Sequence, residues 1–259
     1  GTLPGGGYVF ASESCALDAV GATLLRDVEP GEIVVADAKT GELRSITDHV
    51  GRPDTQMCVF EFIYFARPDS IIEGSSVHEA RKQAGRFLAQ EHPVDADVVI
   101  GVPDSGLDAA LGYSQESGIP YGIGFIKNKY IGRTFIQGSQ KQRENSVRIK
   151  LNVISSTVKG KRVVLVDDSI VRGTTSARII KLLVATGRSV EQINEIIGAD
   201  TLGYLSTEHV VQLAKNANCG FCTACFTGEY AVKPDEVLST DIHERHLNDR
   251  PKDEKKLGE

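Results

Sequence analysis

The stretch that most constrains the fold runs from Arg162 to Ile180 and reads RVVLVDDSIVRGTTSARII. Residues Val163–Val166 form a short, continuous and mostly β-branched run, which predicts a fully buried strand. Two adjacent carboxylates directly after this run would be costly to bury unless something positive met them. We therefore expect Asp167 and Asp168 to lie at the carboxyl end of the strand and to face a crevice, where open α/β sheets bind ligands.

The residues that follow the two carboxylates suit an anion. Arg172–Ser176 (Arg-Gly-Thr-Thr-Ser) offers backbone N–H groups, small hydroxyls and a helix start. Free N–H groups at a helix N-terminus bind phosphate. Because the carboxylates suit hydroxyl groups or a metal, a sugar phosphate would fit both halves of this stretch.

Composition narrows the class of protein. The chain has 259 residues, of which 41% are hydrophobic, so it has room for one large or two modest domains. Its net charge of −6 argues against general binding to nucleic acid or to a membrane surface, and no apolar run approaches the roughly 18–20 residues of a membrane span. Five cysteines, three of them within seven residues, fit a reducing cytoplasm better than a disulfide-built secreted domain.

The chain alternates predicted elements from Gly74 onward. Before this point, residues 1 to about 50 read as short β-like runs, including a hairpin over 31–43. Ser76 and Glu79 form a predicted capping box, and Val77, Ala80, Ala84, Phe87 and Leu88 then share one helical face. Further helix is expected over 104–118, and strands over 58–70, 97–102, 121–127 and 162–167. Such βαβ alternation predicts a parallel sheet.

A second candidate loop, Gly101–Gly106 (GVPDSG), also follows a buried strand and precedes a helix. Its glycines and proline permit a tight turn, and Ser105 and Gly106 open the helix with free N–H groups. The alternative is a simple turn in which Asp104 or Ser105 is the N-cap.

A third candidate, Lys127–Lys150, holds seven basic residues and one acid, Glu144. A solvated basic face would explain this excess, and so would a loop that closes over a polyphosphate and expels water.

Four stretches carry a resemblance to a known family. VVLVDDSIVRGTTS resembles the phosphoribosyl-pyrophosphate signature of type I phosphoribosyltransferases. KNKYIGRTFIQ, CVFEFIYFARPDS and NCGFCTACFTGEYAV are similar to segments of the iron–sulfur branch of the glutamine phosphoribosylpyrophosphate amidotransferases. The similarity runs from about Gly7 to about Val232. It implies an α/β type I phosphoribosyltransferase fold, a parallel sheet flanked by helices, preceded by a β-rich remnant of an N-terminal-nucleophile glutaminase domain. The expected domains are 1–55 (glutaminase portion), 56–232 (phosphoribosyltransferase with a Cys-rich end) and 233–259 (polar tail).

The resemblance also implies roles for single residues. Asp167 and Asp168 match carboxylates that hold the ribose hydroxyls and Mg²⁺, and Ser105 matches a further metal-site residue. The other matches are Asp104 in the pyrophosphate loop, the 5′-phosphate loop of Arg172, Gly173, Thr174, Thr175 and Ser176, and Lys127, Tyr130, Arg133 and Lys150 in or beside a closing loop, the first three as catalytic residues.

The spacing of Cys219, Cys222 and Cys225 suits an iron–sulfur cluster, with zinc as the competing metal. The resemblance implies that Cys58, Cys222 and Cys225 hold a [4Fe-4S] cluster in a longer parent protein, with Cys219 as a spare thiol. The chain lacks the family's Pro-Cys segment, which supplies the fourth ligand.

That segment should follow Gly187. A βαβ unit should return to the sheet there, yet Ser189 and Gln192 read at once as a second helix start. We therefore expect a break between Gly187 and Arg188, where several dozen residues of the family are missing, rather than a simple peptide continuation; a natural or engineered deletion is the alternative.

The resulting hypothesis is a glycosyltransferase that forms 5-phosphoribosylamine from phosphoribosyl pyrophosphate and ammonia, the first step of purine synthesis. Residue 1 is Gly where the family has its nucleophilic Cys, so glutamine hydrolysis is expected only in the full-length enzyme. The resemblance further implies purine nucleotides as inhibitors and a homotetramer. The alternatives are a regulatory module that binds the same ligand and a phosphoribosyltransferase that accepts a base.

Overall fold

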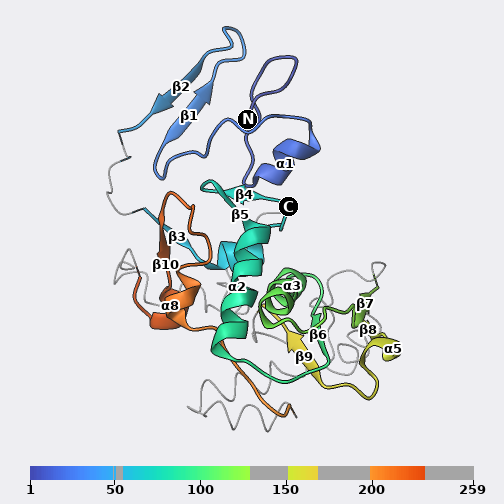
Figure 1. Cartoon of the computed structure of the whole chain (residues 1–259). Helices are drawn as coiled ribbons and strands as arrows, with labels where there is room; N and C mark the ends of the chain where they lie inside the picture. The colour runs from blue at the N-terminus through green and yellow to red at the C-terminus, as the bar shows by residue number, and fades with distance from the viewer. Residues whose placement is uncertain (49, 51–54, 129–150, 169–198, 231–259) are drawn as a thin grey trace, which may run out of the picture. The chain divides into compact units, whose positions relative to one another are not determined.

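The computed structural model describes residues 1–48, 50, 55–128, 151–168 and 199–230. Two compact units divide the chain, Gly1–Phe221 and Cys222–Glu259. The helices and strands of the first unit follow the chain as Figure 1 labels them. Their bounds are α1 (Ser14–Ala19), β1 (Ile33–Ala36), β2 (Leu43–Ile46), β3 (Gln56–Cys58), the π-helix η1 (Glu61–Phe65), β4 (Ile71–Ile72), β5 (Ser75–Ser76), α2 (Val77–Glu91), β6 (Val98–Gly101), α3 (Gly106–Ser117), β7 (Phe125–Lys127), β8 (Leu151–Val153), α5 (Ser155–Val158), β9 (Val163–Val166) and α8 (Thr207–Val210).

Two short elements complete the described part of the chain. Strand β10 (Gly220–Cys222) begins where the first unit ends, and its Gly220 N–H donates to the Thr55 carbonyl oxygen at 2.9 Å. Helix α9 (Ala224–Thr227) belongs to the second unit. None of the helices in the described ranges is long and apolar enough to cross a bilayer.

A parallel strand pair positions the loops of interest. Strands β6 and β9 pair in parallel, from Val98 opposite Val163 to Gly101 opposite Val166. On the other side of β6, the Val99 N–H donates to the Pro120 carbonyl oxygen at 2.9 Å, so the chain after α3 returns alongside this strand. The predicted parallel α/β arrangement is confirmed.

The prediction that Val163–Val166 is fully buried is wrong. Val166 is buried and Val164 packs beside it against α3, whereas Val163 and Leu165 are 37% and 56% exposed. Side chains alternate between the faces of a strand, and only the face toward α3 is covered by a described helix. The strand therefore has one core face and one open face, a pattern that a continuous apolar run does not reveal.

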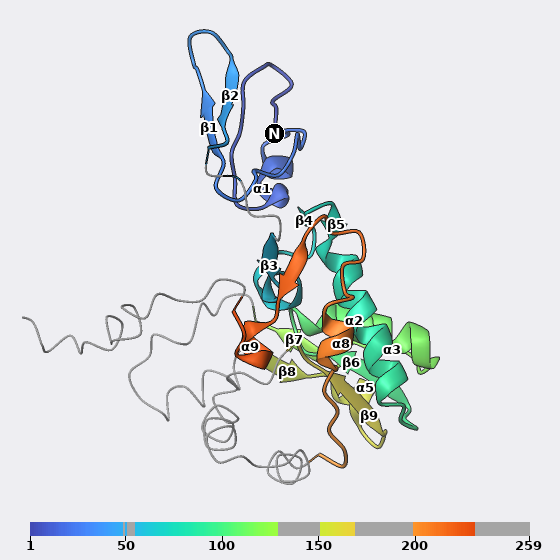
Figure 2. The same cartoon turned by 90° about the vertical axis from the view of Figure 1, so that its left-hand side faces the viewer.

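The two long helices lie side by side against this sheet (Figures 1 and 2). The Ser76 half of the predicted capping box is confirmed, because the Ser76 hydroxyl accepts from the Glu79 N–H at 3.3 Å, whereas the Glu79 carboxylate accepts from Lys82 Nζ at 2.8 Å. Helix α3 ends as predicted at Gly118, which has a φ of 75°. Glycine tolerates this left-handed conformation without the steric cost of a Cβ.

Two glycines set the distance between α2 and α3. A Cβ built on Gly85 would overlap the carbonyl oxygen of Ala109, and one built on Gly112 would overlap that of Lys82. The backbones therefore touch at two reciprocal points. This contact brings Ala89, Ala109 and Tyr113 into one buried cluster with strand residues.

The aromatic segment 58–70 was predicted as a strand, and this prediction is wrong. Only Cys58 belongs to a strand, and Glu61–Phe65 form the π-helix η1. Phe62 is fully buried in the same apolar cluster as Phe87, whereas Tyr64 and Phe65 are exposed. Aromatic residues favour strands only where the pleat gives them two packed surfaces, and here a single ring enters the core.

The remaining β predictions hold in part. Strands β1 and β2 form the expected antiparallel hairpin. The segment expected as a strand over 121–127 starts with a single parallel bridge from Tyr121 to Val99 of β6, and its end forms β7, which pairs antiparallel with β8. In this ladder Lys127 is opposite Leu151.

A polar cluster joins the segment 206–209 to the C-terminal end of α2. Glu91 accepts the Ser206 N–H at 2.9 Å and contacts the Ser206 hydroxyl and His209 Nδ1, while the His209 ring stacks on Phe87 at 4.2 Å. Burial acts to raise the pKa of Glu91, but hydrogen bonds from Ser206 and His209 outweigh it, so the pKa lies below its ordinary value.

Glu91→Gln is expected to lower the free energy of unfolding at neutral pH by about 1–3 kcal/mol, because charge-assisted hydrogen bonds are lost. A carboxyl group whose pKa is lowered by folding stabilises the fold at pH values above its ordinary pKa. This contribution is lost as the pH falls through the pKa of the folded state. The gap between wild type and variant should therefore narrow below pH ~4, as measured by urea unfolding. Glu116→Gln is the matched control, because Glu116 is exposed and accepts from the Gln90 side chain, an uncharged partner on α2. An unchanged gap down to pH ~3 would contradict this account.

Candidate functional site

Two predicted loops meet at the carboxyl ends of β6 and β9. The Val102 N–H donates to the Val166 carbonyl oxygen at 2.9 Å and continues the parallel ladder. The Ser105 hydroxyl then donates to Asp168 Oδ2 and links the two loops directly. The structure thus brings Ser105 and Asp168 together, as the sequence predicts from their places at neighbouring strand ends.

Gly106 permits this approach. A Cβ on Gly106 would lie 2.6 Å from the Val166 carbonyl oxygen and 3.2 Å from Asp167 Cα. Helix α3 begins at this residue, so its N-terminus abuts the end of β9. A helix N-terminus beside two carboxylates can receive a phosphate and a cation together.

The electrostatics of Asp167 fit a cation site. Desolvation by the surrounding atoms, followed by the charge of Asp168, raises the pKa of Asp167 to about 6. Asp167 is nevertheless exposed to solvent, and water screens the repulsion between its carboxylate and that of Asp168. A carboxylate that is open to solvent, and whose ionised form is disfavoured, would be stabilised by a cation.

A basic residue reaches the same loop from β7. Lys127 Nζ forms an ion pair with Asp104, the residue before Ser105. The side chains are 32% and 72% exposed. The family resemblance implies that Lys127, the first residue of the basic stretch, is catalytic, but its pairing with Asp104 was not predicted.

Sequence reasoning also missed Arg81. Its residue surface is only 5% exposed, and it donates to the carbonyl oxygens of Phe62 and Ala66 at 2.9 and 2.8 Å. Desolvation lowers the pKa of Arg81, while nearby carboxylates including Asp168 act in the opposite direction. Position 81 lies one turn after Val77 on the apolar face of α2, and this spacing could have revealed a buried cation.

Several predicted site residues lie outside the described ranges and stay predictions. These are Tyr130, Arg133 and Lys150 in the basic stretch and Arg172, Gly173, Thr174, Thr175 and Ser176 in the phosphate loop. The Gly187–Arg188 junction and the tail over 233–259 also lie outside them.

The cysteines in the described part of the chain do not form a metal site. Within the described ranges, no group of three or more His, Cys, Asp or Glu side chains is gathered closely enough to hold a metal ion. Cys58 and Cys225 are exposed, and Cys219 and Cys222 are half-buried. The assignment of Cys58, Cys222 and Cys225 to a cluster, with Cys219 as a spare thiol, therefore stays a prediction.

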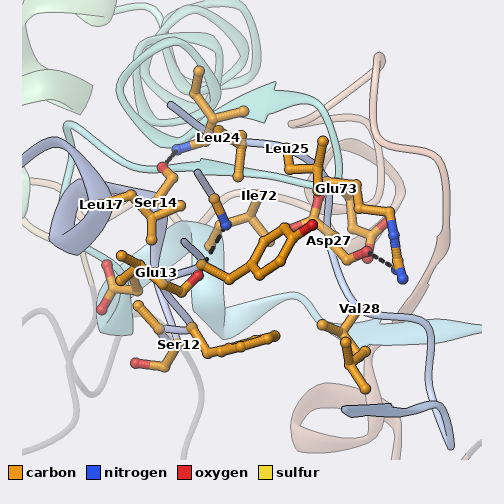
Figure 3. Close-up of a pocket in the computed structure, with 18 of the residues that line it drawn as sticks. Ser12, Glu13, Ser14, Leu17, Leu24, Leu25, Asp27, Val28, Ile72 and Glu73 are labelled. Atoms are coloured by element: carbon orange, nitrogen blue, oxygen red, sulfur yellow. Dashed lines mark hydrogen bonds between the residues drawn. The ribbon is translucent and has the colours of Figure 1, made fainter. Parts of the chain in front are cut away.

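A separate cavity of about 310 Å³ lies in the N-terminal part of the first unit. Figure 3 shows Leu24, Leu25 and Ile72 among its apolar lining residues, and none of the loops after β6 or β9 contributes to it. Beside it, Glu13 accepts the Arg67 N–H at 2.8 Å, which ties the N-terminal segment to the chain after η1. This cavity is distinct from the candidate phosphoribosyl site.

Comparisons with known proteins agree with the geometry. Residues 74–196 match the phosphoribosyl transferase domain family. The chain is 47% identical to the amidophosphoribosyltransferase of Bacillus subtilis, over 89% of this chain and 56% of the relative. It is 46% identical to that of Archaeoglobus fulgidus, over 87% of this chain and 56% of the relative.

A solved structure gives the same result. Glutamine phosphoribosylpyrophosphate amidotransferase from B. subtilis, complexed with ADP and GMP, superposes with a TM-score of 0.73 at 46% identity. The superposition covers 86% of this chain and 56% of that one.

The chain spans about half the length of the curated relatives it matches. The alignment with the B. subtilis relative extends over 268 positions, more than the 259 residues of the chain. The relative therefore has internal residues that this chain lacks, which agrees with a missing segment but does not locate it. With relatives at this identity, a matching fold and the two loops joined at the strand ends, the chain belongs to the amidophosphoribosyltransferase family.

Proposed function

We propose that this chain carries the phosphoribosyl-transfer half of an amidophosphoribosyltransferase and forms 5-phosphoribosylamine from phosphoribosyl pyrophosphate and ammonia. The observation that carries the proposal is the hydrogen bond from Ser105 to Asp168. It joins a pyrophosphate-type loop to a ribose-type carboxylate at the carboxyl edge of a parallel sheet, where such folds bind ligands.

The reaction forms a bond between the ammonia nitrogen and C1 of the ribose and breaks the bond from C1 to pyrophosphate. The nitrogen then loses one proton to water. Because neutral ammonia is already nucleophilic, the site needs no activated nucleophile. Its task is to orient the ribose and to stabilise the charge that develops on the leaving oxygen.

The described residues suit this task. Asp168, which accepts the Ser105 hydroxyl, would accept hydrogen bonds from the ribose hydroxyls. The N–H groups at the start of α3 and the ammonium of Lys127 would bind the phosphate oxygens. We assign Tyr130, Arg133 and Lys150 to the same pyrophosphate, and the loop Arg172, Gly173, Thr174, Thr175 and Ser176 to the 5′-phosphate.

Magnesium fits the oxygen donors at this edge. Ser105, Asp167 and Asp168 present a hydroxyl and two carboxylates, the ligand type that Mg²⁺ prefers. The raised pKa of Asp167 supports this assignment, because a cation would stabilise its ionised form. When bound, Mg²⁺ would neutralise charge on the departing pyrophosphate.

Other parts of the proposal concern the longer protein. The names of the relatives support a glutaminase portion over residues 1–55 and glutamine as the source of ammonia. The relative's complex with ADP and GMP supports purine nucleotides as inhibitors. A [4Fe-4S] cluster on Cys58, Cys222 and Cys225, a homotetramer and a cytoplasmic location complete the proposal.

The test is a comparison of nucleophiles. The chain is incubated with phosphoribosyl pyrophosphate and Mg²⁺, and pyrophosphate release is measured with ammonium or with a purine or pyrimidine base. Release that requires ammonium supports the proposal. Release with a base alone would indicate a different phosphoribosyltransferase, and tight binding without release would indicate a regulatory module.

A further inference from the structure

The ion pair between Asp104 and Lys127 is an unexpected feature of a site for a polyphosphate. Asp104 belongs to the loop after β6, and Lys127 is the last residue of β7. The pair therefore joins the loop that would cradle pyrophosphate to the end of strand β7. In this pair the Asp104 carboxylate binds the Lys127 ammonium, the group to which a phosphate oxygen of the substrate would otherwise bind.

The neighbouring residue shows that Asp104 differs from the rest of its loop. Ser105 turns toward Asp168 and the end of β9, whereas the Asp104 carboxylate turns the other way, toward β7. Asp104 is also largely exposed, at 72% of its side chain. It is thus free to move aside, and its negative charge would repel an anion bound beside Lys127.

We propose that Asp104 is a placeholder that competes with the substrate's pyrophosphate for Lys127. This inference rests on the proposed function of the site. It reverses the role expected for Asp104 from the family resemblance: the residue opposes pyrophosphate binding and keeps Lys127 oriented when no anion is present. An exposed ion pair contributes little to stability, so the competition is weak and the bound anion wins.

The probe is inorganic pyrophosphate with Mg²⁺, titrated calorimetrically into the full chain. Asp104→Asn is expected to bind about two- to fivefold more tightly than wild type, the range that breaking an exposed ion pair allows. Lys127→Gln is expected to bind more weakly. The gain should shrink as ionic strength rises, because salt screens the competing pair.

The double variant separates competition for Lys127 from general repulsion. If Asp104 acts through Lys127, Asp104→Asn gains nothing when Lys127→Gln is already present. If Asp104 only repels the anion, the same gain persists in both backgrounds, and the placeholder role is wrong. Circular dichroism of each variant confirms that the fold is intact.

Failure of this inference is distinguishable from failure of the proposed function. If wild type binds pyrophosphate but Asp104→Asn binds equally or less tightly, Asp104 is neutral or a ligand, and only the placeholder role is overturned. If neither wild type nor Asp104→Asn binds pyrophosphate or phosphoribosyl pyrophosphate, both proposals are overturned.

Discussion

Replacing Asp168 with Asn is expected to lower ammonia-dependent release of pyrophosphate by about a hundredfold or more while leaving the fold intact. The Asn side chain has the same shape and can still accept from the Ser105 hydroxyl, so the contact between the two loops survives. The charge that would hold the cation and orient the ribose is lost. The measurement is turnover with phosphoribosyl pyrophosphate, Mg²⁺ and ammonium, beside a thermal melt of the same preparation.

The matched control is Asp95→Asn. Asp95 lies near the opposite ends of the same two strands, where its exposed carboxylate pairs with Arg162. The substitution removes the same charge from the same sheet without touching the candidate site, so turnover should stay close to that of wild type. If both variants lost activity equally, or if Asp168→Asn kept full activity, the assignment of Asp168 would be wrong.

Gly85→Ala is expected to destabilise the first unit by about 3 kcal/mol or more, at the upper end of the cost of overpacking. The new methyl group would overlap the carbonyl oxygen of Ala109, which is backbone and cannot rotate away. Helices α2 and α3 would have to separate, and Ala109 and Tyr113 would lose part of their buried packing. Urea unfolding measures the loss, and Gly112→Ala, the reciprocal contact with Lys82, should give a similar one.

Gly5→Ala is the control for the change from glycine to alanine itself. A Cβ at Gly5 meets nothing within 4 Å, and its backbone does not have a positive φ. Its stability should change by less than about 0.5 kcal/mol, as for most surface substitutions. A loss at Gly85 no larger than that at Gly5 would show that the helices do not touch at this point.

The helices could be predicted because local and global signals agree. Ser76 and Gly118 mark the start of α2 and the end of α3 through capping chemistry that depends on a few neighbouring residues. The strand prediction over 58–70 was wrong because the conformation of this segment depends on which single ring enters the core. Only tertiary packing decides that this ring is Phe62. The predicted burial of Leu165 was wrong for the same reason, since a run of apolar residues does not indicate which faces of the strand are covered.

Some contacts of the candidate site could likewise be predicted from the sequence, and others could not. Asp168 and Ser105 could be paired in advance because the carboxyl ends of neighbouring parallel strands meet at one edge. Lys127 could be selected as a cation, but its partner could not, because the turn of β7 toward Asp104 depends on the antiparallel ladder with β8. The spacing of Arg81 could have revealed a buried cation, but its two carbonyl partners could not be predicted, because they lie in and directly after a π-helix that was not foreseen.

The most direct test of the central claim is phosphorus NMR of phosphoribosyl pyrophosphate mixed with the chain and Mg²⁺, before and after ammonium is added. The account predicts stable diphosphate signals of the substrate at first, and then their replacement by free pyrophosphate at a rate that rises with ammonia concentration. Asp168→Asn should abolish this replacement, whereas Asp95→Asn should not. Substrate signals that persist with ammonium, or pyrophosphate that appears equally with both variants, would contradict the assignment of the loops after β6 and β9 as a phosphoribosyl-transfer site.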